Sequence, residues 1–503
     1  MRFLSMHESQ ARALLVEAGA ALLAAFLIAG CGNNFRPVVT PVTPSGPAAQ
    51  PTSYAVVVSS PSPTAPGVVT IIDYAGDSVM AVAPIGPGPS AFTIDEGGYT
   101  GYTLNSDGTL SNFPITTTLQ AKNVLYSTLP ATAMPVNLMA PSAGMWAADL
   151  AGNVIDIFQN SPQTFKLAVP VAPTPVTIAG SPVLTGDREY AISQGFSDPT
   201  GVACNVSPTT ASADGVATPI EIATDATDVP IPLGKCPVYA VPSPDQRRLF
   251  VLNRGDDTIT VINSQNNTLD ACTPFLNQNG QTVNCHPTLP LSTSAVKATG
   301  ITPPNGTSGM TAIAGPVYAE YNAATSQLVV ANYDGGTVSV IDVSLDEYGN
   351  DSATFGTTYT IPVGHDPASV TVLADGSRAY TANQADGTVT VVNLVSHSVE
   401  KTLSVVGHPR TVVSTQNSLY GKVYVDSPDS PYLTILQTTS DLVDTTVLLE
   451  GNAVDVRTTT QNGTSGNSNY VSRVPGYGEP CNLPGVPTPT GTQTLLQACQ
   501  AIP

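Results

Sequence analysis

A motif that recurs along most of this chain constrains its fold more than any other feature. The best copies span residues 248–263, 327–342 and 378–393, and each reads as two short apolar strands around a polar turn. Short strands of Val, Ile and Thr, joined by Gly, Asp and Asn turns at a period of roughly 40 residues, are typical of propellers in which each repeat forms one four-stranded blade. We therefore predict an all-β fold, a single closed β-propeller over residues 54–460.

The number of blades follows from prolines that recur at the start of the first strand of each later unit. They are Pro89, Pro135, Pro175, Pro237, Pro316, Pro367 and Pro409. Residues 54–85 supply three strands without a first one, and residues 452–458 form a first strand with nothing after it. Pairing the two ends completes one more blade and removes open sheet edges, which promote aggregation. We predict eight blades, or seven if one irregular unit between Pro135 and Gly234 is not a full blade.

The composition excludes some classes of partner. The chain is 42% hydrophobic but only 11% charged, and long helical patterns are absent after residue 30, as in secreted all-β proteins. Its 17 basic and 37 acidic side chains give a formal net charge of −20. Because this charge repels phosphate backbones, we expect no nucleic-acid partner.

The N-terminus has the features of an export signal. An apolar run at residues 18–30 follows Arg2 and Arg12, is too short to span a bilayer comfortably, and ends directly before Cys31. The four residues Ile-Ala-Gly-Cys that end at Cys31 resemble the bacterial lipobox, in which the cysteine receives diacylglycerol. We predict a lipoprotein signal over residues 1–30, with Cys31 as the lipidation site. The alternative is a plain secretory signal with an incidental cysteine.

The segments on either side of the propeller are expected to be irregular. Residues 31–53 carry five prolines among Thr, Ser, Ala and Gln, and they predict an extended, lipid-anchored linker. Residues 461–503 are rich in Gly, Pro, Asn and Thr and predict an irregular, disulfide-stapled tail. No Asp follows Cys31, which is similar to lipoproteins forwarded to an outer membrane. We expect an exported protein, lipid-anchored in the bacterial cell envelope at the outer membrane.

Six cysteines remain after Cys31. They are Cys204, Cys236, Cys272, Cys285, Cys481 and Cys499. An even number suits disulfides in an oxidising compartment, and proximity in the sequence favours pairing them consecutively, although six cysteines allow other pairings. Their spacing to histidine does not match a zinc site, and we expect no metal or other cofactor.

Short motifs recur at equivalent positions of the repeats. They are Val-Val-Ala-Asn ending at Asn332, Tyr-Thr-Ala-Asn ending at Asn383, Val-Ser-Val-Ile-Asp ending at Asp342 and Ile-Pro-Val-Gly-His-Asp-Pro ending at Pro367. These motifs resemble the YVTN-family propeller repeat of exported and surface-layer proteins, strongly over residues 234–450, visibly at 54–86 and weakly over 87–233. The resemblance implies an architecture, with no single activity attached to it.

Two histidine-containing turns occupy the same repeat position in neighbouring units. They are His365-Asp366-Pro367 and His408-Pro409-Arg410, and we expect them at the mouth of the central channel together with Asp257, Asp334 and Asp386. Histidines beside carboxylates could bind a metal or act as acid and base. The alternative is that His-x-Pro simply fits the turn.

Motifs for catalysis are sparse. The sequence has no Gly-x-Ser-x-Gly elbow, no phosphate-binding Gly-rich loop with Lys and no His-Glu-x-x-His. Propeller lactonases, which this repeat family distantly resembles, use scattered Glu, His and Arg residues near the channel. That resemblance makes Glu320, His365, His408 and Arg410 the catalytic candidates.

The functional expectation is a scaffold rather than an enzyme. We expect non-catalytic binding of an envelope protein or polysaccharide through loops on one face, helped by long insertions after Thr209 and Thr268, because loops on a rigid ring are where such folds place recognition. A lactonase-like hydrolase at the channel mouth is the alternative.

Overall fold

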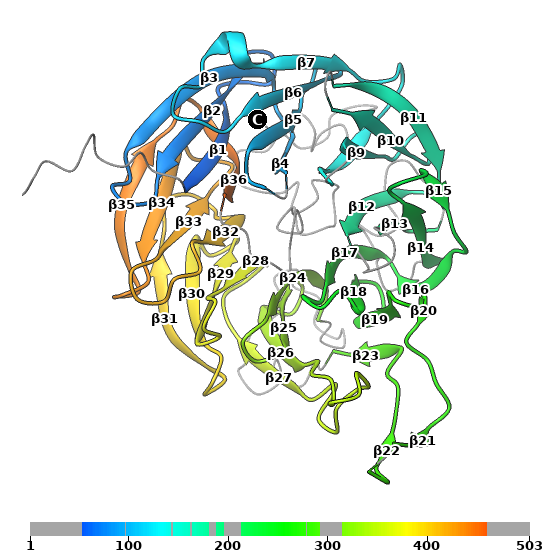
Figure 1. Cartoon of the computed structure of the whole chain (residues 1–503). Helices are drawn as coiled ribbons and strands as arrows, with labels where there is room; N and C mark the ends of the chain where they lie inside the picture. Colours follow the sequence, from blue (N-terminus) through cyan, green and yellow to red (C-terminus); the bar gives the residue numbers. More distant parts are fainter. Residues whose placement is uncertain are drawn as a thin grey trace, which may run out of the picture. The chain divides into compact units, whose positions relative to one another are not determined.

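The strands of this protein form a ring of blades. The computed structural model describes residues 53–95, 97–141, 144–160, 163–180, 188–195, 213–277, 279–291 and 314–459. Within these residues the structure is almost entirely β, apart from one short 3-10 turn, η1 (Ala121–Asn123). Eight blades make up the ring in this part of the chain, which confirms the predicted propeller and the higher of the two blade counts (Figure 1). No helix among the described residues is long and apolar enough to cross a membrane.

Blade 1 is built from strands that are far apart in the sequence. From the centre outward it contains β36 (Asn452–Thr458), β1 (Tyr54–Ser60), β2 (Pro66–Asp73) and β3 (Val79–Pro87). Strand β36 runs antiparallel to β1, with Val456 opposite Val57. The predicted closure of the ring by residues 452–458 is confirmed.

Blades 2 to 8 follow the order of the chain, each from its innermost to its outermost strand. Blade 2 contains β4 (Ala91–Ile94), β5 (Thr100–Leu104), β6 (Thr109–Pro114) and β7 (Leu125–Thr128). Blade 3 contains β8 (Pro135–Met139), β9 (Gly144–Asp149), β10 (Val154–Gln159) and β11 (Thr164–Pro170). Blade 4 contains β12 (Pro175–Gly180), β13 (Arg188–Ser193) and β14 (Asp214–Glu221), with β15 (Ala226–Thr227) and β16 (Ile231–Lys235) both along β14.

Blade 5 contains β17 (Pro237–Pro242), β18 (Arg248–Asn253) and β19 (Thr258–Asn263), with β20 (Thr268–Leu269) and β23 (Thr288–Pro290) both along β19. Blade 6 contains β24 (Pro316–Asn322), β25 (Gln327–Asn332), β26 (Thr337–Asp342) and β27 (Thr358–Pro362). Blade 7 contains β28 (Pro367–Val372), β29 (Arg378–Asn383), β30 (Thr388–Asn393) and β31 (Ser398–Ser404). Blade 8 contains β32 (Thr411–Ser414), β33 (Lys422–Asp426), β34 (Tyr432–Gln437) and β35 (Leu442–Leu448).

The prolines used to count blades mark the innermost strands. Five of them are the first residue of β8, β12, β17, β24 and β28, and the other two stand two residues before β4 and β32. Proline has no N–H to offer a sheet ladder, so the first position of a strand suits it. The innermost strands of successive blades pack against one another all the way round, from β4 to β36 and back to β4.

A recurring asparagine holds the hairpin between the second and third strands of a blade. At the end of β25, the side-chain amide of Asn332 donates to the hydroxyls of Thr337 (3.0 Å) and Ser339 (2.8 Å) on β26. Asn105, Asn253 and Asn383 make the same pair of bonds in blades 2, 5 and 7. Since these side chains are buried, an unpaired amide there would cost about 1–3 kcal/mol. The asparagine of the sequence motif therefore has a structural role.

Blade 3 carries two carboxylates where blades 2, 5, 6 and 7 carry this amide and hydroxyl. Asp149 ends β9 and Asp156 lies seven residues later on β10, the spacing that separates Asn332 from Ser339. Burial and, to a smaller extent, the nearby Asp149 raise the pKa of Asp156 to about 7. A buried carboxyl beside a second carboxylate favours the protonated form. Below about pH 7, blade 3 therefore favours a bound proton at a place where blades 2, 5, 6 and 7 have an amide and a hydroxyl.

This difference predicts a pH-dependent stability that can be assigned to one residue. The pKa of Asp156 rises from 3.8 to about 7 on folding. In the unfolded chain Asp156 loses its proton near pH 4, whereas in the folded protein it keeps the proton up to about pH 7. The free energy of unfolding therefore falls by up to about 4 kcal/mol as the pH rises from about 4 to about 7. Asp156→Thr restores the hydroxyl of the other blades and should raise the thermal midpoint at pH 8 while changing it little at pH 4.

The measurement is a set of thermal unfolding curves between pH 4 and pH 8. Glu450→Gln, at an exposed carboxylate, is the matched control and should follow the wild type throughout. Parallel profiles for the wild type and Asp156→Thr would show that Asp156 is ionised in the folded protein.

Candidate functional site

Each predicted histidine is held by an aspartate of its own blade. The backbone N–H of His365 donates to Asp386 (2.7 Å), and the Nδ1 atom of the same histidine lies 2.8 Å from the other carboxylate oxygen. His408 and Asp429 repeat this arrangement, with distances of 2.8 and 2.6 Å. In blade 5 the N–H of Lys235 donates to Asp256 (3.1 Å). In all three blades the partners are 21 residues apart, so the aspartate caps the entry to the innermost strand whatever side chain stands there.

An ion pair joins the equivalent hairpins of blades 5 and 6. The guanidinium of Arg254 donates through Nε (2.8 Å) and one terminal nitrogen (2.6 Å) to the two carboxylate oxygens of Asp334. It also lies 5.4 Å from the ring centre of Tyr333. Bidentate pairs of this kind have a fixed geometry, so they set the relative position of the two hairpins.

Several predicted carboxylates gather around this ion pair and influence one another. Burial and the negative charge of Asp334 raise the pKa of Asp366, whereas His365 and Arg254 lower it, and the net result is a pKa of about 6. Burial also raises the pKa of Asp257, although the hydrogen bond that Asp257 accepts from the N–H of Gly315 (2.8 Å) lowers it. The structure therefore brings together the predicted residues of blades 5, 6 and 7.

The remaining candidates lie apart from this group. The side chain of Arg410 is only 5% exposed, and it pairs with Asp426 of its own blade at 3.7 Å. Burial and the nearby Asp455 raise the pKa of Asp426, and Arg410 opposes them. Glu320 is buried towards the other end of its innermost strand, where it accepts a hydrogen bond from the N–H of Val372 (3.2 Å).

This arrangement limits the chemistry that the histidines can perform. The Nδ1 atom of each is committed to a carboxylate, so only Nε2 remains for another partner, and the side chains of His365 and His408 are 41% and 27% exposed. Among the described residues, no group of three or more His, Cys, Asp or Glu side chains could hold a metal ion.

A second polar cluster lies at the outer edge of blade 5, where the sequence predicted a disulfide and a long insertion but no polar network. Strands β20 and β23 together form the outer strand, and between them residues 270–287, which we call the arm, leave the blade. Cys272 and Cys285 are bonded, with Cα atoms 5.4 Å apart, which confirms that predicted pair. Beyond them β21 (Phe275–Leu276) and β22 (Thr282–Val283) form a small antiparallel hairpin (Figure 1).

The other predicted cysteine pairs fall partly or wholly outside the described residues. Cys236 is disulfide-bonded. Its predicted partner Cys204 lies outside the described residues, as do Cys481, Cys499 and Cys31, so these assignments stay predictions.

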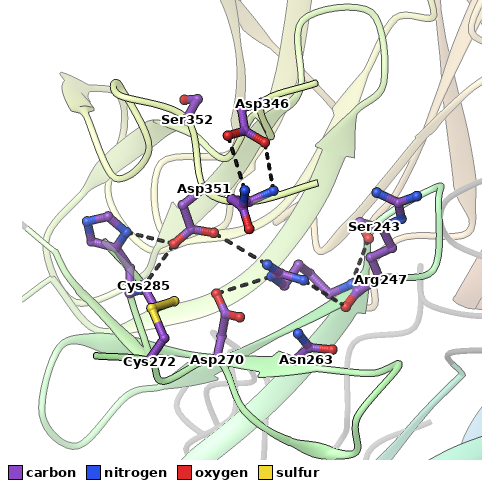
Figure 2. A network of polar contacts seen from close by, with 12 residues as sticks. Ser243, Arg247, Asn263, Asp270, Cys272, Cys285, Asp346, Asp351 and Ser352 are labelled. Carbon is purple, nitrogen blue, oxygen red and sulfur yellow. Dashed lines mark hydrogen bonds and ion pairs between the residues drawn. A yellow bond between two sulfur atoms is a disulfide. The ribbon is translucent and has the colours of Figure 1, made fainter. Parts of the chain in front are cut away.

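The base of the arm is fixed by a buried network that spans two blades (Figure 2). Arg248 of β18 pairs with Asp270 of the arm (3.2 Å) and with Asp351 (3.5 Å), which belongs to an insertion of blade 6. His286 of the arm bonds to the same Asp351 through its backbone N–H (3.0 Å) and its Nδ1 atom (2.8 Å), and its ring stacks on Phe355. Burial raises the pKa of Asp270, and Arg248 opposes this effect while Asp351 adds to it.

The insertion of blade 6 also supports the tip of the arm. We call residues 343–357 the support loop. The amide of Asn279 at the tip donates to Glu347 (2.9 Å), and the nearby Asn277 helps to lower the pKa of Asp346. Asp346 in turn accepts the backbone N–H groups of Tyr348 and Asn350, both at 2.9 Å, which closes the support loop on itself. The arm is therefore held at its base and at its tip.

No protein-family model matches this sequence, and neither does any curated protein. Solved structures do resemble its fold. Apo AztD from Citrobacter koseri aligns over 81% of this chain and 97% of its own, with a TM-score of 0.51 at 12% identity. The dihydro-heme d1 dehydrogenase NirN, in complex with DHE, aligns over 81% of this chain and 75% of its own, with a TM-score of 0.53 at 14% identity. At such identities the likeness shows a β-propeller and nothing of function.

Removing the disulfide should loosen the arm without unfolding the blades. In Cys272→Ser/Cys285→Ser the network of Arg248, Asp351 and His286 still holds the base, whereas the closed loop of the hairpin is lost, a constraint worth at most about 3 kcal/mol. Hydrogen exchange should become faster in residues 273–284 and stay slow in β18 and β19. Thr273→Ser, at an exposed arm position, serves as the control. Equal acceleration in β18 and β19 would show that blade 5 depends on the bridge.

Proposed function

We propose that this protein is an exported, lipid-anchored propeller of the bacterial cell envelope that acts as a non-catalytic scaffold for binding a protein or polysaccharide. The observation that carries the proposal is that His365 and His408 cap the entries to the innermost strands of their blades. The backbone N–H and the ring Nδ1 of His365 and of His408 each contact an aspartate 21 residues later in the sequence. Lys235 occupies the same repeat position at the entry to blade 5. A site built for acid–base catalysis would need its groups to converge on one reacting atom.

The two insertions support a binding function. The arm and the support loop come from neighbouring blades. A disulfide closes the arm, and a buried ion network and a hydrogen bond fix the arm against the support loop. Holding a loop in one conformation lowers the entropy that it loses on binding. Rigid loops on a rigid ring are how propellers and other scaffolds present recognition surfaces.

The alternative is a lactonase-like hydrolase, and it rests on the cluster of Asp257, Asp334, Asp366 and His365. The carboxyl of Asp366, with a pKa of about 6, is the group best suited to exchange a proton near neutral pH. A putative 6-phosphogluconolactonase from Bacteroides fragilis aligns with a TM-score of only 0.48, which is too low to support the alternative.

Turnover of lactones by the purified full chain separates the two functions. We expect no hydrolysis above the buffer rate, with His365→Ala, His408→Ala and Asp366→Asn indistinguishable from the wild type. Lys235→Ala is the matched control, because it changes the same repeat position where no histidine stands. A measurable rate that falls roughly 100-fold in His365→Ala or Asp366→Asn but not in Lys235→Ala would establish the hydrolase.

Anchoring through Cys31 is a separate part of the proposal. Cys31→Ser removes the thiol that would receive the lipid, so the protein should move from the membrane fraction to the soluble fraction of the envelope. The wild type should incorporate a labelled fatty acid and the variant should not. Membrane association of the variant, together with an unlabelled wild type, would contradict lipidation.

A further inference from the structure

The tip of the arm exposes apolar side chains that the fold does not use. Phe275 and Leu276 of β21 are 44% and 68% exposed, and Tyr348 of the adjoining support loop is 43% exposed. Val283, opposite Phe275 on β22, is buried, whereas Phe275 and Leu276, which as neighbours on one strand point to opposite faces of the hairpin, are exposed. We call Phe275, Leu276 and Tyr348 the apolar tip. Aromatic and aliphatic anchors on a rigid support are characteristic of interface centres.

The charges around the apolar tip have one prevailing sign. Between Cys272 and Cys285 the arm has no charged residue, and the support loop has three acidic and no basic residues. Asp346 and Glu347 lie directly beside Tyr348, and hydrogen bonds lower the pKa of Asp346, which keeps it ionised. One cation, Arg247, lies over Gly349 and is itself paired with Asp245 at 3.8 Å. The rim of the apolar tip is therefore net acidic.

The arm is held in place before any partner arrives. Its base is tied to both blades through Asp351, and its tip is tied through Asn279 and Glu347. Within the hairpin, Asn277 accepts the N–H groups of Asn279 (3.0 Å) and Gln281 (2.9 Å), which fixes the turn. So many restraints on an exposed insertion are not required by the blade, whose outer strand is complete with β20 and β23.

We propose that the apolar tip and its acidic rim dock a segment of another envelope protein that carries Lys or Arg beside apolar side chains. This inference rests on the proposed scaffold function and names the partner class and the surface. The partner segment passes around the end of the hairpin, so that its apolar side chains contact Phe275 and Leu276 on the two faces and Tyr348 of the support loop, and its cations face Asp346 and Glu347. Complementary charge at the rim sets specificity and the rate of association more than the affinity, which comes from the desolvated centre.

The test uses the full chain in cells, with the photoreactive amino acid benzoylphenylalanine at position 276. Illumination should give one discrete adduct, and its partner peptide, identified by mass spectrometry, should contain Lys or Arg next to an apolar residue. Phe275→Ser and Glu347→Lys should each reduce the adduct by roughly tenfold. Glu347→Gln, which keeps an acceptor for Asn279, should also reduce it, because it removes only the charge.

Two controls separate this surface from the scaffold function as a whole. The same probe at position 420, where Tyr420 is 84% exposed on blade 8, should give no such adduct, and Glu450→Lys should leave the adduct at 276 unchanged. An adduct at 420 without one at 276 would overturn this docking surface and leave the scaffold function standing. No adduct at either position would count against both. An adduct at 276 with a glycan or with a second copy of this chain would overturn the proposed partner class.

Discussion

Closure of the ring is the constraint on which the rest of the structure depends. Each blade buries Val, Ile and aromatic side chains against two neighbours, so a ring open at one point would leave two blade faces in water. The pairing of β36 with β1 prevents this by making one blade from strands that are almost 400 residues apart, with the hydroxyl of Ser59 donating to the carbonyl of Glu450 across 391 residues of sequence. The order of every other blade can then simply follow the chain.

The hairpins of one face are held by side chains that differ little between blades. An asparagine fastens the second strand to the third in blades 2, 5, 6 and 7, and an aspartate 21 residues after the blade entry fastens that entry in blades 5, 7 and 8. Because the aspartate accepts from the backbone N–H at the blade entry, the residue at that entry can be lysine or histidine. The face thus varies in chemistry while its geometry is conserved from blade to blade.

The repeat made most of the fold predictable, and features outside the repeat were not. Blade count, ring closure and the Cys272–Cys285 bridge all follow from local patterns or from neighbouring positions. The network at the base of the arm does not, because His286 and Asp351 lie 65 residues apart in insertions that have no counterpart in the other blades. The pair of Asp149 and Asp156 could have been found, since it occupies positions that alignment of the repeats identifies as amide and hydroxyl. The sequence also could not show that Glu320 and the histidines belong to different ends of the innermost strands.

The outer strand of blade 5 is divided into β20 and β23, so the blade can accommodate an insertion between them. Strand β19 pairs with β20 at one end and with β23 at the other, so the hydrogen-bond ladder is resumed after the chain has left the blade and returned. The inserted segment needs only to begin and end close together. Here the Cα atoms of the bridged cysteines are 5.4 Å apart. Blade 4 divides its outer strand in the same way, between β15 and β16. One insertion can therefore replace another at the perimeter of such a ring without altering the packing of the strands at its centre.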